Sequence, residues 1–258
     1  MPLHPDWLIP DWHAVGVGAL MTTRRGGVST APFDSFNLGD RTGDAAAAVA
    51  HHRAQLARAV GATPVWLNQV HGARVVRLTD ADAVQGAPVH DADACVTTRP
   101  GIACTVQVAD CLPVLFAAPD GRAVGAAHAG WRGLASGVLE ATLRAVCEAA
   151  SCEPPQVQAW LGACIGPGQF EVGADVVEAF GGAAHENVAL RFAPQASGKW
   201  LADLPRLAQD RLRAAGIKAP RGGTWCTAID ASRFFSFRRD RVTGRMAALV
   251  WITAPGGR

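Results

Sequence analysis

A cysteine and a histidine lie on the two arms of an expected β-hairpin in residues 109–133, ADCLPVLFAAPDGRAVGAAHAGWRG. Two apolar runs flank Asp120-Gly121, and Asp-Gly between apolar runs is a strong hairpin signal, because both central residues of a type I′ turn need a positive φ. With this turn, His128 lies opposite Pro113, and Cys111 is its diagonal neighbour on the same face. The pattern therefore predicts a thiol and an imidazole that share one small space.

Two kinds of chemistry fit this pair. Diagonal neighbours have α-carbons about 7–8 Å apart, which suits a thiolate and an imidazole that share a zinc ion at about 2.3 and 2.0–2.1 Å. The same spacing suits a Cys–His nucleophile pair. His71, in the NQVHG segment after a short expected strand, completes a His/Cys/His set with Cys111 and His128. Three protein ligands from separate segments and an open fourth position are typical of a catalytic zinc site.

Other polar residues beside glycines and turns are candidates for catalysis or binding. Asp110 directly precedes Cys111, so it is a candidate general base or a partner that orients a ligand histidine. Arginine forks suit phosphate or carboxylate groups, and several arginines lie in the TRRGG, GWRG and FRRD segments. The SFNLG segment adds an asparagine. The candidate substrate-binding residues are Arg24, Asn37, Arg132 and Arg239.

Strands and helices alternate along the chain and position these residues. Apolar, β-rich segments predict strands at 14–23, 65–67, 75–78, 94–98, 102–108, 157–161, 224–229 and 245–252, besides the two hairpin arms. Helical spacing predicts helices over 45–60, 134–150, 174–179 and 201–215, the first with Asp44 as its N-cap and Gly61 as its end. Interleaved strands and helices with one tight hairpin favour a mixed-sheet α/β or α+β domain.

The composition argues against several classes of protein. A chain of 258 residues with 49% hydrophobic residues has material for one large domain or two small ones. The 24 basic and 22 acidic residues include no basic block, so we expect no nucleic-acid partner. No apolar run reaches the roughly 20 residues of a membrane span. Seven cysteines, and an N-terminus without the features of a signal peptide, favour a reducing, cytoplasmic setting.

The chain resembles the YfiH-type laccase-domain family in motifs that span nearly its whole length. The matching segments are TRRGGVS (23–29), SFNLG (35–39), NQVHG (68–72), DADACVTT (91–98), VADCLPVLF (108–116), AAHAGWRG (126–133), GACIGPGQFEVG (162–173) and FRRDRVTGRMAALVW (237–251). The resemblance implies one domain over residues 1–258 with an α/β (α+β) fold of mixed sheets packed between helices, related to the Cys–His deamidase toxins. It also implies a zinc site at His71, Cys111 and His128. One departure is His52, in VAHHRAQL, where the family pattern has asparagine.

Members of this family have been described as multicopper polyphenol oxidoreductases, as purine nucleoside phosphorylases and as peptidoglycan editing factors. The resemblance implies zinc-dependent phosphorolysis of adenosine, inosine and methylthioadenosine, with deamination of adenosine as a side activity. The ligands are then a purine nucleoside and phosphate, and we expect a monomer. One alternative is copper-dependent phenol oxidation, for which a single His/Cys/His set offers few ligands. Others are a metal-free hydrolase or amidase with Cys111 as nucleophile and His128 as base, and a binding domain with a structural zinc.

Overall fold

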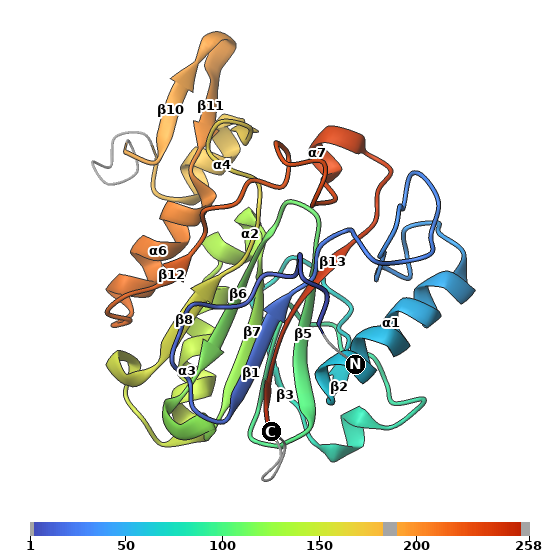
Figure 1. Cartoon of the computed structure of the whole chain (residues 1–258). Helices are drawn as coiled ribbons and strands as arrows, with labels where there is room; N and C mark the ends of the chain where they lie inside the picture. The colour runs from blue at the N-terminus through green and yellow to red at the C-terminus, as the bar shows by residue number, and fades with distance from the viewer. Residues whose placement is uncertain (1–2, 183–189, 254–258) are drawn as a thin grey trace.

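Two mixed β-sheets pack face to face at the centre of the computed structural model, which describes residues 3–182 and 190–253 (Figure 1). The four-stranded sheet has the order β1 (Val17–Met21), β13 (Met246–Ile252), β5 (Ile102–Val108) and β2 (Thr63–Val65). The six-stranded sheet has the order β12 (Arg221–Gly222), β8 (Gln158–Leu161), β6 (Leu112–Ala117), β7 (Val124–Ala129), β4 (Ala94–Thr97) and β3 (Val75–Arg77). A three-stranded sheet of β10 (Phe192–Gln195), β11 (Lys199–Ala202) and β9 (Glu171–Val172) projects from one end (Figure 1).

Helices cover the outer faces of the two central sheets. The helix α1 (Ala46–Val60) packs with the four-stranded sheet, whereas α3 (Val138–Ala150) and α6 (Leu204–Ala214) pack against the six-stranded sheet. The remaining helices are short: α2 (Trp131–Ala135), α4 (Ala174–Ala179), α7 (Phe237–Asp240) and the 3-10 turns Asp80–Ala83, Pro119–Gly121, Pro154–Gln156 and Ala196–Gly198. The predicted α/β fold, with mixed sheets packed between helices, is confirmed.

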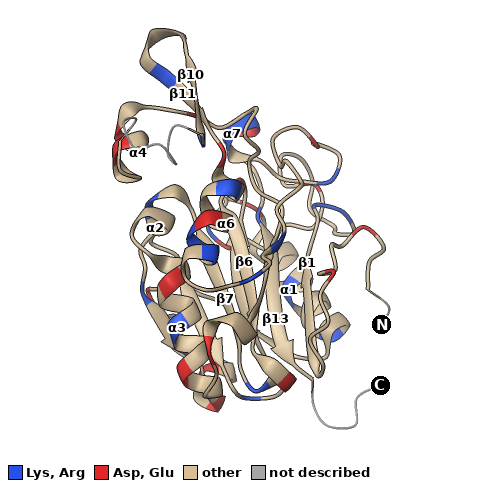
Figure 2. Ribbon diagram, turned by 90° about the vertical axis from the view of Figure 1, so that its left-hand side faces the viewer, with Lys and Arg blue, Asp and Glu red and all other residues tan. Residues whose placement is uncertain are grey.

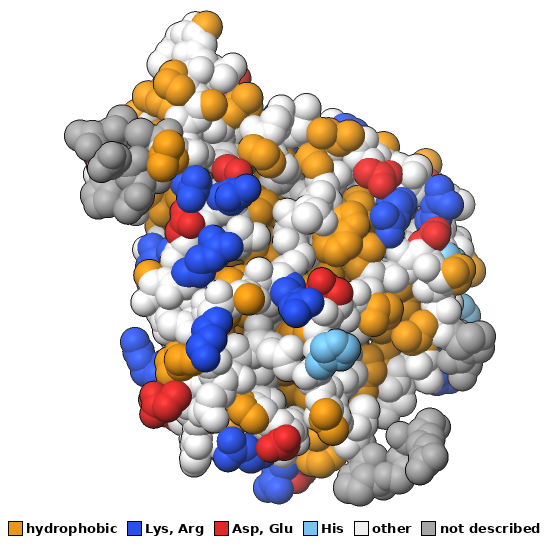
Figure 3. All heavy atoms as spheres, turned by 60° about the vertical axis from the view of Figure 1, so that its left-hand side comes forward, with side chains coloured by type: hydrophobic (Ala, Val, Ile, Leu, Met, Phe, Trp, Pro, Cys, Tyr) orange, Lys and Arg blue, Asp and Glu red, His pale blue; other side chains and the backbone are white. Residues whose placement is uncertain are grey.

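Charged residues are kept out of the central layers. The strands β6, β7 and β13 contain no Asp, Glu, Lys or Arg, and Figure 2 shows such residues on helices and loops around them. Basic and acidic side chains are interspersed with apolar ones on the face drawn in Figure 3. In the part of the chain that the structure describes, no helix has the length and apolar character needed to cross a bilayer.

The hairpin of β6 and β7 forms in the predicted register. Pro113 pairs with His128 in the antiparallel ladder. Asp120 and Gly121 have φ values of 57° and 64°, as a type I′ turn requires. The N–H of Arg122 donates to the carbonyl of Pro119 at 3.2 Å and closes the turn. The local turn chemistry therefore fixes which strand residues face one another.

Several predicted elements differ from the structure. The helix expected over 134–150 is two helices, because Gly137 has a φ of 88° and interrupts the helical hydrogen bonds between α2 and α3. The helix expected over 201–215 begins at Leu204, after Asp203 accepts a capping bond from the Arg206 N–H, and residues before it pair as β11. The strand expected over 224–229 is wrong: this segment forms only an isolated bridge at Cys226.

The start of α1 also differs from the prediction. Its N-cap is Ala45, which offers no side-chain cap, and the expected cap Asp44 instead accepts hydrogen bonds from Ser29 Oγ at 2.6 Å and Asn37 Nδ2 at 2.9 Å. His52, the departure from the family pattern, is buried on α1. It accepts from the Val28 N–H and donates to the Asn37 carbonyl, both at 2.8 Å, so it ties two loops to the helix.

Candidate active site and metal centre

His71, Cys111 and His128 meet at one end of the central sheets, and we call them the His/Cys/His cluster. Cys111 immediately precedes β6, His128 lies on β7, and His71 lies in the loop after β2 with a φ of 61°. Cys111 Sγ is 3.9 Å from His71 Nε2, and one ligand atom from each residue lies within 4.8 Å of the others. Ligands of a tetrahedral zinc are about 3.3–3.8 Å apart for bonds of about 2.0–2.3 Å. The three side chains therefore fit a zinc ion after a small inward movement.

Asp93, which directly precedes β4, is the residue that holds this cluster together. Its buried carboxylate accepts from His128 Nδ1 at 2.8 Å and from the His71 N–H at 2.9 Å through Oδ1. Its Oδ2 accepts from the N–H groups of Val70 at 3.1 Å and Gly72 at 2.7 Å. Because Nδ1 of His128 is engaged, Nε2 of that ring is left for a metal, as in carboxylate–histidine–zinc arrangements.

The charges of Cys111 and His128 depend on one another. Burial raises the pKa of the Cys111 thiol, but the charge of His128 and hydrogen bonds from both histidines outweigh it and lower the pKa to about 6. Burial lowers the pKa of His128, but the Cys111 thiolate and the Asp93 hydrogen bond outweigh it and raise the pKa to about 9. Without metal the site therefore holds a thiolate–imidazolium pair at neutral pH, and a thiolate is the form that binds zinc.

The carboxylate of Asp110 bonds to residues outside the His/Cys/His cluster, although Asp110 directly precedes Cys111. It is buried with a φ of 94°, and its carboxylate accepts from Thr227 Oγ1 at 2.6 Å and Ser236 Oγ at 3.0 Å. The N–H of Arg238 donates to it at 2.6 Å. These contacts fix the segment before α7 to the start of β6, and the orienting contact to a cluster histidine comes from Asp93 instead.

Two of the candidate substrate-binding arginines bind other groups of the protein through their guanidinium groups. Arg24 forms an ion pair with Asp34 at 3.1 Å and donates to the carbonyls of Asp34 and Ala231 at 2.7 and 3.0 Å. Arg239 forms an ion pair with Asp240 at 2.7 Å and donates to backbone carbonyls at 2.9–3.2 Å. The structure therefore places both in loop-to-loop contacts.

The other two candidates differ in their exposure. Asn37 is fully buried, where its side chain donates to Thr42 Oγ1 at 2.9 Å and accepts from the Arg245 N–H at 2.8 Å. Arg132 is exposed on α2, with its guanidinium carbon 4.3 Å from the centre of the Trp131 ring. Neither residue contributes to the lining of the cavity described next.

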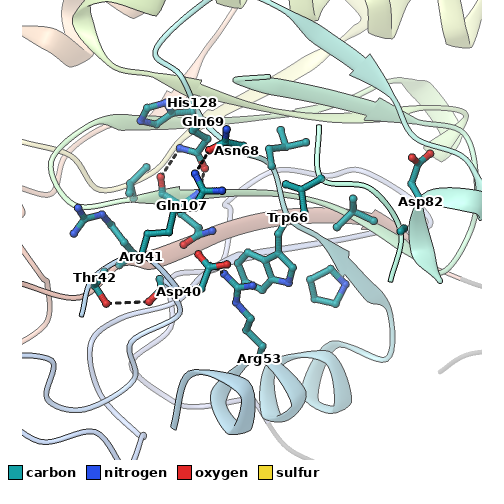
Figure 4. A pocket seen from close by; sticks show the side chains of 18 of the residues that line it. Asp40, Arg41, Thr42, Arg53, Trp66, Asn68, Gln69, Asp82, Gln107 and His128 are labelled. Atoms are coloured by element: carbon teal, nitrogen blue, oxygen red, sulfur yellow. Dashed lines mark hydrogen bonds and ion pairs between the residues drawn. The ribbon is translucent and has the colours of Figure 1, made fainter. Parts of the chain in front are cut away.

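A cavity of about 660 Å³ opens from the His/Cys/His cluster (Figure 4). Its lining includes Trp66 and the segment 82–89. The arginines that line it are Arg41, Arg53 and Arg245, which the sequence reasoning did not select. Gln69 fixes the adjoining loop to β5, because its side-chain amide exchanges hydrogen bonds of 2.8 and 2.7 Å with the backbone of Gln107 (Figure 4). A nucleoside-sized molecule fits this volume beside the cluster.

We expect iodoacetamide to alkylate Cys111 of the metal-free protein at half its maximal rate near pH 6, because the thiolate fraction rises with pH through a pKa of about 6. Cys147 on α3 is the internal control, since burial and the neighbouring Cys152 raise its pKa to about 12. The measurement is the rate of iodoacetamide labelling of each cysteine between pH 4 and 10, by mass spectrometry after chelator treatment. A Cys111 midpoint near the ordinary value of about 8.5 would contradict the thiolate–imidazolium pair.

Comparisons with known proteins find matches over nearly the whole chain. The family model described as multi-copper polyphenol oxidoreductase laccase matches residues 18–253. The purine nucleoside phosphorylase PA4543 of Pseudomonas aeruginosa is 47% identical over 95% of this chain and 98% of its own. The purine nucleoside phosphorylase YfiH of Escherichia coli is 44% identical over 95% and 98%.

Solved structures match over similar lengths. The crystal structure of Neisseria meningitidis protein NMB0706 is 44% identical, with a TM-score of 0.89 over 96% of this chain and 100% of that one. The crystal structure of YlmD from Geobacillus stearothermophilus is 30% identical, with a TM-score of 0.90 over 98% of each chain. The fold is therefore common to this chain and these proteins.

Proposed function

The chain belongs to the multi-copper polyphenol oxidoreductase laccase family, and from that premise we propose that it is a zinc-dependent purine nucleoside phosphorylase. The observation that carries the proposal is the His/Cys/His cluster at the head of a nucleoside-sized cavity. The relatives named purine nucleoside phosphorylase support it. The proposed substrates are inosine, adenosine and methylthioadenosine with phosphate, and the products are the free base and a ribose 1-phosphate.

The cluster also supports adenosine deamination as a proposed side activity. Zinc bound by these three residues would supply Lewis acidity and an activated water, which deamination requires. The protein's own contribution is positional: Asp93 sets the tautomer and the ring orientation of His128 and fixes the loop that carries His71. Apolar residues of the lining, among them Trp66, Val84 and Val89, provide a surface for a planar purine, with one face of the Trp66 ring covered by the Arg53 guanidinium.

Two other activities remain as alternatives with specific tests. Among residues 3–182 and 190–253, His71, Cys111 and His128 form the one group of three or more side chains with metal-ligand spacing, which is too few for several coppers. Phenol oxidation by copper-reconstituted protein, fast and with several tightly bound coppers, would favour the oxidase. Hydrolysis of peptidoglycan fragments by metal-free protein would favour a Cys111 nucleophile with His128 as base.

The proposed function is tested with protein purified without added metal. Inosine is incubated with and without phosphate, and hypoxanthine and ribose 1-phosphate are quantified together; adenosine is assayed in parallel for inosine. We expect equal amounts of both products that depend on phosphate. The Cys111→Ala variant, prepared identically, controls for contaminating host phosphorylase. Release of base without phosphate dependence would contradict phosphorolysis.

The seven cysteines are all free thiols. Unpaired thiols are typical of proteins in reducing compartments, so this feature supports the cytoplasm as the proposed location.

A further inference from the structure

Three arginines from separate segments line the cavity that the His/Cys/His cluster also lines. Arg41 follows the SFNLG segment, Arg53 lies on α1, and Arg245 directly precedes β13. Arg53 already has a partner, because it forms an ion pair with Asp40 at 3.3 Å and its guanidinium lies 4.2 Å from the centre of the Trp66 ring. Arg41 and Arg245 form no ion pair among the residues that the structure describes.

Arg245 is the more enclosed of the two. Its Nη1 donates to the carbonyls of Thr243 at 3.1 Å and Gly244 at 3.0 Å, which fixes the side chain. Gly39 leaves room for it, since a Cβ at Gly39 would lie 2.8 Å from Arg245 Cγ. Throughout residues 3–182 and 190–253, no carboxylate lies within ion-pair distance of its guanidinium.

An enclosed cation without a carboxylate partner is costly unless an anion balances it. Arg245 lines the same cavity as Cys111 and His128. Arg41 is exposed at the opening and hydrogen-bonds Asn68 (Figure 4). An anion held by Arg245 would therefore lie inside the cavity beside the metal ligands.

We infer that Arg245 binds the phosphate co-substrate, with Arg41 as a second cation at the cavity mouth. The inference rests on the proposed phosphorolysis and assigns the residues that hold phosphate in that reaction. An oxygen of HPO₄²⁻ forms a bond to C1′ of the ribose while the bond from C1′ to the purine nitrogen breaks. The electron pair of the broken bond leaves with the purine, and the phosphate proton is transferred to it. The guanidinium fork holds two other phosphate oxygens during this exchange.

The test compares Arg245→Gln, Arg245→Lys and Arg245→Ala with the control Arg144→Gln, an exposed arginine on α3 outside this cavity. We expect Arg245→Gln to lower kcat/KM for phosphate about ten- to a hundredfold, with the KM for inosine within about twofold and zinc content unchanged. Arg245→Lys should recover part of the loss, because lysine keeps the charge and loses the fork. Guanidinium ion at millimolar concentration should partly restore Arg245→Ala.

The outcomes separate this inference from the proposed function. Absence of phosphate-dependent cleavage in the wild-type protein would overturn the proposed function, and the inference with it. If the wild type is active and Arg245→Gln shows an unchanged phosphate dependence, the inference alone is overturned. The same holds if the phosphate KM rises in Arg132→Gln and not in Arg245→Gln. Should Arg245→Gln fail to fold, the phosphate KM of Arg245→Lys decides, since a structural role would not change it selectively.

Discussion

Replacing Cys111 with alanine should remove the metal and the phosphorolytic activity together. We expect the wild-type protein, purified without added metal, to hold about one zinc per chain. The variant keeps His71 and His128 but loses the thiolate, which is the one anionic ligand of the cluster. Removing a group that only orients a ligand costs about 10–100-fold in metal affinity, so removing a ligand should cost more than about a hundredfold. Elemental analysis and the inosine assay measure the two losses.

A matched thiol variant separates loss of the metal from general effects of losing a cysteine. Cys147→Ala removes a thiol on α3, outside the cluster, and should keep both zinc and activity. Full zinc occupancy in Cys111→Ala would show that the metal binds elsewhere. Loss of activity with full retention of zinc would favour the metal-free reading, in which Cys111 acts as a nucleophile.

The hairpin explains why the sequence was sufficient to find two of the three cluster residues. Asp120-Gly121 sets the turn, the turn sets the register, and the register brings Cys111 and His128 to one face. All of this information is local, within about twenty residues of chain. His71 joins them from a loop far away in the sequence, where its place after a short expected strand made it a candidate and the resemblance to the family supported it.

Asp93 could not be identified in this way because its role arises from the tertiary structure. The carboxylate contacts residues 70–72 on one side and His128 on the other, segments that local patterning does not connect. The available signal was weak: an aspartate in DADACVTT, directly before an apolar strand that neighbours the hairpin. Asp110 was the more obvious choice, since it adjoins Cys111, but its side chain faces the segment 227–238.

The difference between local and tertiary information also explains why the sequence reasoning selected other arginines than those that line the cavity. Arginines beside glycines or polar turns were selected because such turns can approach a ligand, and the structure shows Arg24 and Arg239 bound to carbonyls of neighbouring loops. Arg245 also adjoins a glycine, Gly244, but it directly precedes an apolar strand and the sequence reasoning did not select it. Its position is set by the pairing of β13 with β5, a contact between residues more than a hundred positions apart.

Replacing Asp93 with asparagine should weaken both the metal site and the fold while keeping the side chain's shape. Four donors point at the carboxylate: two at Oδ1, from His128 and His71, and two at Oδ2, from Val70 and Gly72. An asparagine has one oxygen and one NH₂ group. Whichever way the amide is turned, its NH₂ faces two donors, so at least two buried hydrogen bonds are lost.

The expected size follows from these contacts. Unsatisfied buried groups cost about 1–3 kcal/mol each, so the free energy of unfolding of metal-free Asp93→Asn should fall by about 2–6 kcal/mol. Zinc affinity should fall about 10–100-fold, because His128 loses the partner that fixes its ring. Urea denaturation and competition with a chromophoric chelator measure the two quantities, with the exposed Asp175→Asn on α4 as the matched control. A folded Asp93→Asn protein with wild-type zinc affinity would contradict the positioning role of this carboxylate.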